Sequence, residues 1–292
     1  MTGKDAKMKM KQNNTPASLP KWNRIIITAI LSVIGIVMCL PLIWMISTSF
    51  KVEADVFNFP IEWIPKRSNG LKNYKDVWFG QVSFATYYWN SIKVTLLSVF
   101  FSVLIGSLAA YGFSRIDFPG RDKLFLLYLA TMAIPEQVTL VPRFILFKYI
   151  GLFDTHLCLI LNASFSVLSV FMLRQFMMTI PKELTDAAKI DGAGHLCTLF
   201  RIILPVAKPS IATFAILKFV WTWNDYQGPL VFLTSPKLYT IQLGVKMFSD
   251  AYGDFYSLMM AAAVSAILPL IIVFVFGQKY IIAGLVSGSV KG

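Results

Sequence analysis

The chain has 292 residues, of which 56% are hydrophobic and only 14% are charged. Charged residues alone make up about a quarter of an average soluble domain, so this composition excludes an ordinary soluble protein and indicates a membrane protein. The net charge of +12 does not indicate nucleic-acid binding. The basic residues lie in short segments between apolar runs and form no stripe interleaved with aromatic side chains.

The sequence contains few of the residue patterns that are typical of enzymes or metal-binding proteins. Cys39, Cys158 and Cys197 are far apart, and His156 and His195 are the only histidines, so neither a disulfide framework nor a metal site is expected. The Gly-x-x-x-x-Gly-Lys-Ser/Thr loop that binds nucleotide phosphates is missing from the sequence. We therefore expect no ATP hydrolysis and assign no catalytic residue.

Six apolar segments are long enough to cross a membrane, whose hydrocarbon core of about 30 Å takes roughly 20 residues of helix. Two of them are interrupted. The first follows several lysines but is too long for the apolar part of a signal peptide, so it is interpreted as a retained span. The sequence predicts an all-α membrane protein with six transmembrane helices, at Ile25–Phe50, Ile92–Phe113, Leu124–Val141, Leu157–Met178, Pro209–Leu233 and Ser257–Gly277.

The distribution of charge predicts the orientation of these helices. The two tails, the 114–123 loop and the 174–208 segment carry 16 Lys and Arg against 6 Asp and Glu, whereas the rest of the chain carries 11 and 9. Basic residues accumulate on the cytoplasmic side of membrane proteins. We expect both termini to be cytoplasmic, with a tail at 1–24, a first span at 25–50, an external loop at 51–86, a core of five spans at 87–277 and a second tail at 278–292.

One polar segment, 181–207, separates the fourth and fifth spans within this core. Pro181 suits a first helical position, Glu183 and Asp186 place negative charge near the start of a helix, and Gly192 permits a sharp reversal. A second helical piece with an apolar face follows and is expected to end at Leu204-Pro205. Ala187 and Ala188 leave room for a close neighbour, so the segment suits insertion into a groove. The same pattern is typical of an amphipathic helix on lipid headgroups.

This segment resembles the EAA motif of bacterial ABC importer permeases. Asp186-Ala187-Ala188, Gly192, Ile202 and Leu204-Pro205 occupy the motif positions, and the one departure is Asp186 in place of glutamate. Trp221-Thr-Trp-Asn-Asp-Tyr and the C-terminal fifteen residues resemble the carbohydrate-uptake branch of that family, in particular the smaller, six-span permease subunit of the maltose system. Together these similarities cover most of the chain.

The resemblance implies a type I importer permease fold and a set of partners. A homologous second permease, two cytoplasmic ATPase subunits that bind ATP and magnesium, and an external solute-binding protein would move a sugar or oligosaccharide by alternating access across a bacterial inner membrane. The segment would be a coupling helix in a cleft of an ATPase, through Glu183, Asp186, Ala187, Ala188, Gly192, Leu204 and Pro205. The tail would contact the ATPases through Gln278, Lys279, Gly288 and Lys291.

Polar residues inside the spans are candidates for the solute pathway, since ionisable groups in a membrane usually face a cavity or a partner. Lys218 lies about 13.5 Å along the fifth span, with Thr222 and Asp225 on the same face. Two interpretations of Lys218 remain open: an ion pair, with Glu136 or with the partner permease, and contact with an acidic sugar. The candidates are Glu136, Gln137, Lys218, Thr222, Asn224 and Asp225.

Other function classes fit less well. An ion-coupled secondary transporter is the main alternative, but the halves show no clear repeat and the polar segment would be unexplained. A membrane-embedded enzyme would need a nucleophile and base in proximity, which the spans do not suggest. The sequence does not distinguish a neutral from an acidic sugar.

Overall fold

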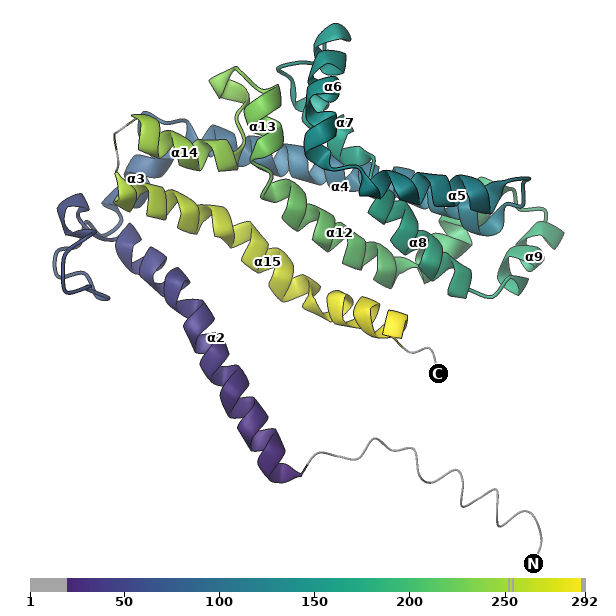
Figure 1. The fold of residues 1–292 in the computed structure, drawn as a ribbon, viewed down its shortest axis with the longest axis horizontal. Helices are drawn as coiled ribbons and strands as arrows, with labels where there is room; N and C mark the ends of the chain where they lie inside the picture. Colours follow the sequence, from purple (N-terminus) through teal and green to yellow (C-terminus); the bar gives the residue numbers. More distant parts are fainter. Residues whose placement is uncertain (1–19, 252, 254, 290–292) are drawn as a thin grey trace, which may run out of the picture.

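The computed structural model describes residues 20–251, 253 and 255–289, and these residues form helices joined by short loops, with one antiparallel bridge between Lys51 and Ser68 (Figure 1). Two long helices organise the bundle. α4 (Phe84–Arg115) packs against α7, α8, α12 and α14, and α15 (Tyr256–Ser289) packs against α2, α3, α12 and α14. The remaining described helices are shorter.

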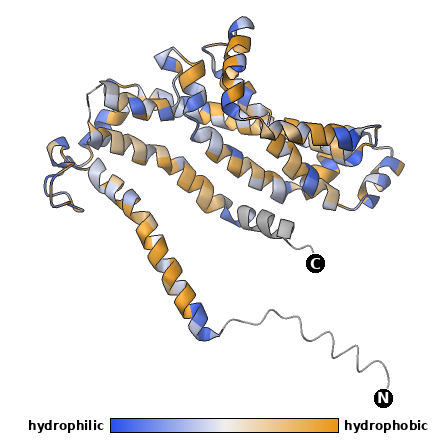
Figure 2. Cartoon of the chain, in the orientation of Figure 1, coloured by the Kyte–Doolittle hydropathy of each residue, from blue (hydrophilic) through white to orange (hydrophobic). Residues whose placement is uncertain are grey.

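The first helix of the described residues, α2 (Lys21–Ser49), projects away from the bundle and contacts it through α15 (Figure 1). Its side chains are apolar and exposed along most of its length (Figure 2). An exposed apolar surface of this extent is unfavourable in water and suits lipid or another apolar helix.

Within the part of the chain that the structure describes, four helical segments are long and apolar enough to cross a membrane, or up to six if each of two bent pairs is one span. The four are α2, α4, His156–Thr179 and the 256–280 part of α15. The third of these, His156–Thr179, combines α7 (His156–Ser164) and α8 (Val167–Thr179). The predicted all-α fold with several membrane helices is confirmed.

The third predicted span is sharply bent. α5 (Arg121–Ala130) and the short turn η2 (Thr131–Ala133) meet α6 (Glu136–Tyr149) at an angle of 97°. Pro135 causes this break, because a residue before proline avoids the helical region, and Ile134 is extended with φ −78° and ψ 116°. The fifth predicted span is also divided, into α12 (Lys208–Trp223) and α13 (Gln227–Phe232).

The segment between the fourth and fifth spans contains α9 (Glu183–Ile190) and then a continuous helical stretch of α10 (His195–Thr198), the π-helical turn η3 (Leu199–Ile203) and α11 (Leu204–Val206). The stretch ends at Val206, one residue beyond the expected Leu204-Pro205, and the chain then turns at Ala207 and enters α12 at 81°. The wider π turn before Pro205 accommodates a residue that has no N–H to donate to the preceding turn.

Two buried clusters mark the two ends of the bundle. One cluster, near α3 (Lys72–Phe79) and α14 (Ile241–Ala251), includes Phe84, Trp223 and Phe248. The other lies where α4, α5 and α8 approach α10 and η3, and it includes Tyr111, Leu173 and Ile203. We refer to these as the α14 end and the α9 end.

The C-terminal tail expected from residue 278 is continuous with the last membrane helix, because α15 runs without interruption to Ser289. Gln278 and Lys279 are exposed, and their contacts are local, to Val275 O and the Tyr280 ring. Gly288 lies within the helical backbone of α15. Lys291 lies outside the described residues.

Candidate functional site

Helix α9 ends in a turn that depends on glycine. Gly192 has a φ of +79°, in the left-handed region that a side chain disfavours. Its N–H donates to Lys189 O at 3.0 Å, and the N–H of Ala193 donates to Ala188 O at 2.8 Å. This is the Schellman arrangement that ends a helix on a left-handed residue, and it gives the reversal predicted at Gly192.

One side of α9 faces its own chain and the other faces solvent. Thr185 and Ala188 are buried, at 5% and 4% exposure. Ala187 is exposed, and Leu184 and Ile190 retain 42% and 86% of their accessible surface. The helix therefore presents a small apolar surface, which we call the α9 face, formed by Leu184, Ala187 and Ile190. The carboxylates of Glu183 and Asp186 are also exposed.

The other residues predicted to couple to an ATPase are not all available for contact. Ala188 packs against its own chain, so a bulky replacement there would disturb the internal packing of this protein before it met a partner. In the second helical piece Leu199 and Ile203 are buried, whereas Leu196 and Phe200 are exposed, so the expected apolar face is divided between the core and solvent. Leu204 is half-buried and Pro205 is exposed.

A polar cavity of ≈ 350 Å³ lies between α4, α6, α7, α12 and α13. Ligand sites in proteins typically have volumes of about 300–1,000 Å³. Four of the predicted pathway residues line this cavity: Glu136, Lys218, Thr222 and Asp225. The structure thus brings together residues from the third and fifth spans that are more than eighty positions apart.

The breaks in both spans position these side chains. Glu136 opens α6 directly after the Pro135 break. Asp225 lies in the gap between α12 and α13, where its Oδ1 accepts the N–H of Gly228 at 2.9 Å. A Cβ added at Gly228 would lie 2.4 Å from Asp225 Oδ2, so a side chain there would displace this carboxylate from its present position. Asp225 therefore has a structural role at the start of α13 in addition to lining the cavity.

The expected ion pair between Lys218 and Glu136 is not formed. Glu136 Oε1 instead accepts from Arg143 Nη2 at 3.1 Å, two turns along the same helix, and Arg143 Nη1 also donates to Asn162 Oδ1 at 2.6 Å. Within the described part of the chain, Lys218 has no carboxylate within 4 Å. Its electrostatic neighbours are Asp225 and Glu136.

Sequence reasoning missed six polar lining residues: Ser91, Thr95, Arg143, Asn162, Ser166 and Thr240. Arg143 carried a usable signal, since a cation within an apolar segment and seven residues after Glu136 lies on the same helical face. The structure does not bring Gln137 or Asn224 into the cavity lining. Gln137 is exposed, and the Asn224 amide donates to Val220 O at 2.9 Å. Among the described residues no group of three or more His, Cys, Asp or Glu could hold a metal ion.

The chain is similar in sequence to known transport proteins over nearly its whole length. The arabinooligosaccharides transport system permease protein AraQ of Halalkalibacterium halodurans is 34% identical over 284 residues, covering 97% of this chain and 100% of that protein. The melibiose/raffinose/stachyose import permease protein MelC of Bacillus subtilis is 34% identical, covering 91% of this chain and 96% of that protein.

Among solved structures, a bacterial ABC transporter involved in the import of the acidic polysaccharide alginate has a chain of the same fold. The TM-score is 0.79 at 24% identity, over 91% of this chain and 99% of that one. A profile of one family, described as the binding-protein-dependent transport system inner membrane component, matches residues 102–286. These matches confirm the resemblance seen in the sequence motifs: the chain belongs to the binding-protein-dependent transport system inner membrane components.

Proposed function

We propose that this chain is one membrane subunit of an ATP-driven, binding-protein-dependent importer that moves a sugar or oligosaccharide into the cytoplasm. The observation that carries the proposal is α9, a short helix that packs one side on its own chain and presents the α9 face to solvent. Isolated apolar side chains on a protruding helix suit a groove in a partner protein. Membership of this family supports an ATPase subunit as that partner.

The relatives and the cavity support a sugar as the solute. Two relatives that are more than 30% identical to this chain are named for the sugars they transport: arabinooligosaccharides for one, and melibiose, raffinose and stachyose for the other. In this chain the cavity is lined by hydroxyl, amide and charged groups, which suit the hydroxyls of a sugar. Two cations, Arg143 and Lys218, balance two carboxylates, Glu136 and Asp225. This balance favours a neutral oligosaccharide over a uronic one.

The remaining partners follow from the same proposal. A homologous second permease completes the pathway, two ATPase subunits carry ATP and magnesium, and an external binding protein delivers the sugar. Both termini and α9 lie on the cytoplasmic side, in agreement with the excess of Lys and Arg on those segments. The 278–292 region contacts the ATPases. Approach of the two ATPases draws the coupling helices together and opens the cavity to the outside.

The proposal is tested by uptake in proteoliposomes that contain the whole complex. We expect labelled neutral oligosaccharide to accumulate with ATP and binding protein, and not with an ion gradient alone. Uptake that follows the ion gradient and survives ATP depletion would instead establish the ion-coupled alternative. Preference for a uronic oligosaccharide would assign Lys218 to substrate charge and overturn the neutral assignment.

The docking role of α9 has a separate test. Ala187→Trp places a large side chain on the α9 face, and we expect it to abolish co-purification with the ATPase while the chain still inserts into membranes. The matched control is Ala54→Trp, the same change at an exposed alanine in the external loop. Unchanged co-purification of the Ala187 variant would contradict docking through this face.

A further inference from the structure

Two arginines connect the inner ends of α4 and α8 in a reciprocal way. Arg115, the last residue of α4, donates through Nη2 to Met177 O and, at 2.6 Å, to Ile180 O at the end of α8. Arg174, in the last turns of α8, donates through Nε to Phe113 O at the end of α4 at 3.1 Å. Each arginine therefore donates to carbonyls at the C-terminal end of the other helix, where backbone acceptors outnumber the helical N–H donors.

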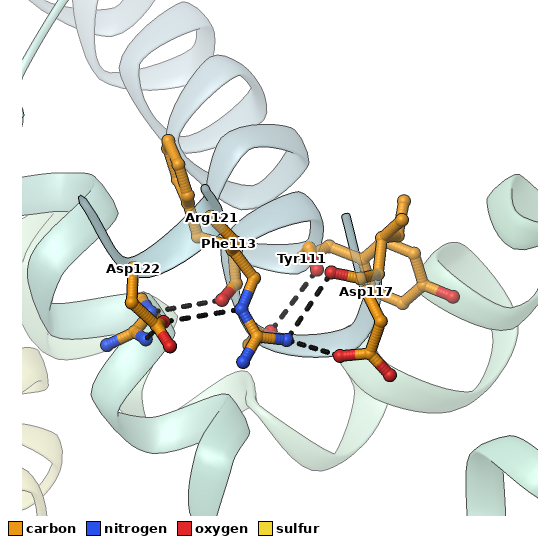
Figure 3. A network of polar contacts seen from close by, with 8 residues as sticks. Tyr111, Phe113, Asp117, Arg121 and Asp122 are labelled. Atoms are coloured by element: carbon orange, nitrogen blue, oxygen red, sulfur yellow. Dashed lines mark hydrogen bonds and ion pairs between the residues drawn. The ribbon is translucent and has the colours of Figure 1, made fainter. Parts of the chain in front are cut away.

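Arg174 extends this connection to α5. Its Nη2 lies 3.1 Å from Asp122 Oδ1, in the first turn of α5, and its guanidinium lies 4.0 Å from the centre of the buried Phe125 ring. Arg174 itself is only 9% exposed. Figure 3 shows the α4–α5 part of this network, in which Arg121 lies between Asp117 and Asp122. The three helices are thus held by fixed, short polar contacts.

The position of these contacts gives them a functional meaning. Ile180 directly precedes the Pro181-Lys182 link to α9, so Arg115 fixes the point from which α9 leaves the bundle. The opposite parts of the same helices line the cavity, through Ser91 and Thr95 of α4 and through Ser166, the cap of α8. Contact between α4 and α8 is also tight midway, where Ser169 Oγ donates to Ser102 O at 3.1 Å.

We propose that Arg115 and Arg174 are positioning residues that make the ends of α4, α5 and α8 move as one body with α9, so that displacement of α9 reaches the cavity. We call this set of contacts the arginine clamp. The inference rests on the proposed function, because it assumes that α9 is moved by an ATPase. It goes beyond that function by assigning transmission to particular side chains that touch neither the ATPase nor the sugar.

Coupling stoichiometry tests the clamp in the complete complex. We expect Arg174→Lys to retain assembly and ATP hydrolysis but to lower the sugar transported per ATP by about tenfold, because a single ammonium cannot reproduce the two-pronged contact with Phe113 O and Asp122. Arg115→Met should have a similar effect. Arg115→Lys should recover part of the coupling, since both acceptors of Arg115 are reached from one nitrogen.

The matched control is Arg121→Lys, in the same network but paired with Asp117 and Asp122, whose side chains are 87% and 68% exposed. We expect its coupling to stay within about twofold of the unmodified complex, since exposed pairs contribute little. Hydrogen exchange at residues 180–190 should also accelerate in Arg115→Met and stay unchanged in Arg121→Lys.

Different failures have different meanings. Unmodified complex that shows no ATP-dependent sugar uptake would refute the proposed function itself. Uptake and ATP hydrolysis that fall in proportion, with sugar per ATP unchanged in both Arg115→Met and Arg174→Lys, would refute the clamp and leave the function standing.

Discussion

The two ends of the bundle are stabilised by opposite chemistry. At the α14 end a carboxylate accepts backbone N–H groups, since Glu53 caps the start of α15 through Tyr256 N and Ser257 N at 2.9 and 2.8 Å. In the loop between α6 and α7, Asp154 likewise accepts from Thr234 N and Ser235 N. At the α9 end arginines donate to backbone carbonyls. Anions suit helix N-termini and cations suit helix C-termini, so each end uses the sign its exposed backbone groups require.

This difference gives the charge asymmetry of the sequence a second meaning. The excess of Lys and Arg on certain segments predicts orientation in the membrane, because basic residues accumulate on the cytoplasmic side. Two of those arginines, Arg115 and Arg174, are also the donors that complete the ends of α4 and α8. The side chains that contribute to the charge pattern predicting orientation therefore also complete the helix ends. Substitutions at each end test this difference.

The largest effect is expected for Arg174→Met. The change removes the donors to Phe113 O and Asp122 and leaves a carbonyl without its partner, so we expect a loss of about 2–4 kcal/mol in the free energy of unfolding. Denaturant unfolding in detergent measures it. Arg121→Met, whose contacts are exposed, should cost less than about 1 kcal/mol. Equal losses would show that the α9 end does not depend on its buried arginine.

Gly192→Val should have the next largest effect, confined to α9. A left-handed residue costs about 1–2 kcal/mol when it carries a side chain, and a β-branched one is the least tolerated. Because nothing lies within 4 Å of the added Cβ, a clash does not contribute. Hydrogen exchange of Lys189–Ala193 should accelerate, and Gly192→Asn should lie between valine and glycine. Equal protection in all three would contradict the role of the turn.

At the α14 end, Glu53→Ala should cost about 1 kcal/mol, the usual value of a helix N-cap acceptor. Exchange of the first turn of α15 reports it. Glu62→Ala is the control, because Glu62 pairs with Lys66, whose side chain is 80% exposed. If the two substitutions had the same effect on hydrogen exchange in α15, the contacts of Glu53 would not be what stabilises the start of this helix.

The smallest effect is the acid sensitivity of the Asp154 contact. The Ser235 hydroxyl, with the N–H groups of Ser235 and Thr234, lowers the pKa of Asp154 from 3.8 to about 2. A pKa lowered by folding means that the carboxylate stabilises the fold above about pH 4 and that this contribution is lost as pH falls through about 2. Unfolding of Asp154→Asn, followed from pH 5 to 2, should be less pH-dependent than that of the unmodified protein. An unchanged pH profile would refute this.

Some features of the site were accessible from local sequence because they depend on near neighbours. The Gly192 turn follows from one residue that lacks a side chain, and the α5–α6 break follows from Pro135. The shared face of Lys218, Thr222 and Asp225 follows from helical spacing. Each needs only backbone geometry over one or two turns.

Other features required contacts between distant segments. Glu136 pairs with Arg143 and not with Lys218 because of how α6 and α12 are placed. The burial of Ala188 depends on which residues pack against α9. Residues Gln137 and Asn224 have the right chemistry for the cavity, but their side chains face elsewhere. Spacing along one helix predicts which residues share a face, but it does not predict which other helix that face contacts.

The sequence by itself determined the membrane class, the helical fold and the family, because hydrophobic runs, charge distribution and the 183–205 pattern are local and additive along the chain. Only the tertiary structure decided which polar groups share a cavity and which arginines connect α4, α5 and α8. Those contacts join residues more than fifty positions apart, as Arg115 and Ile180 show, and depend on where the helix ends meet.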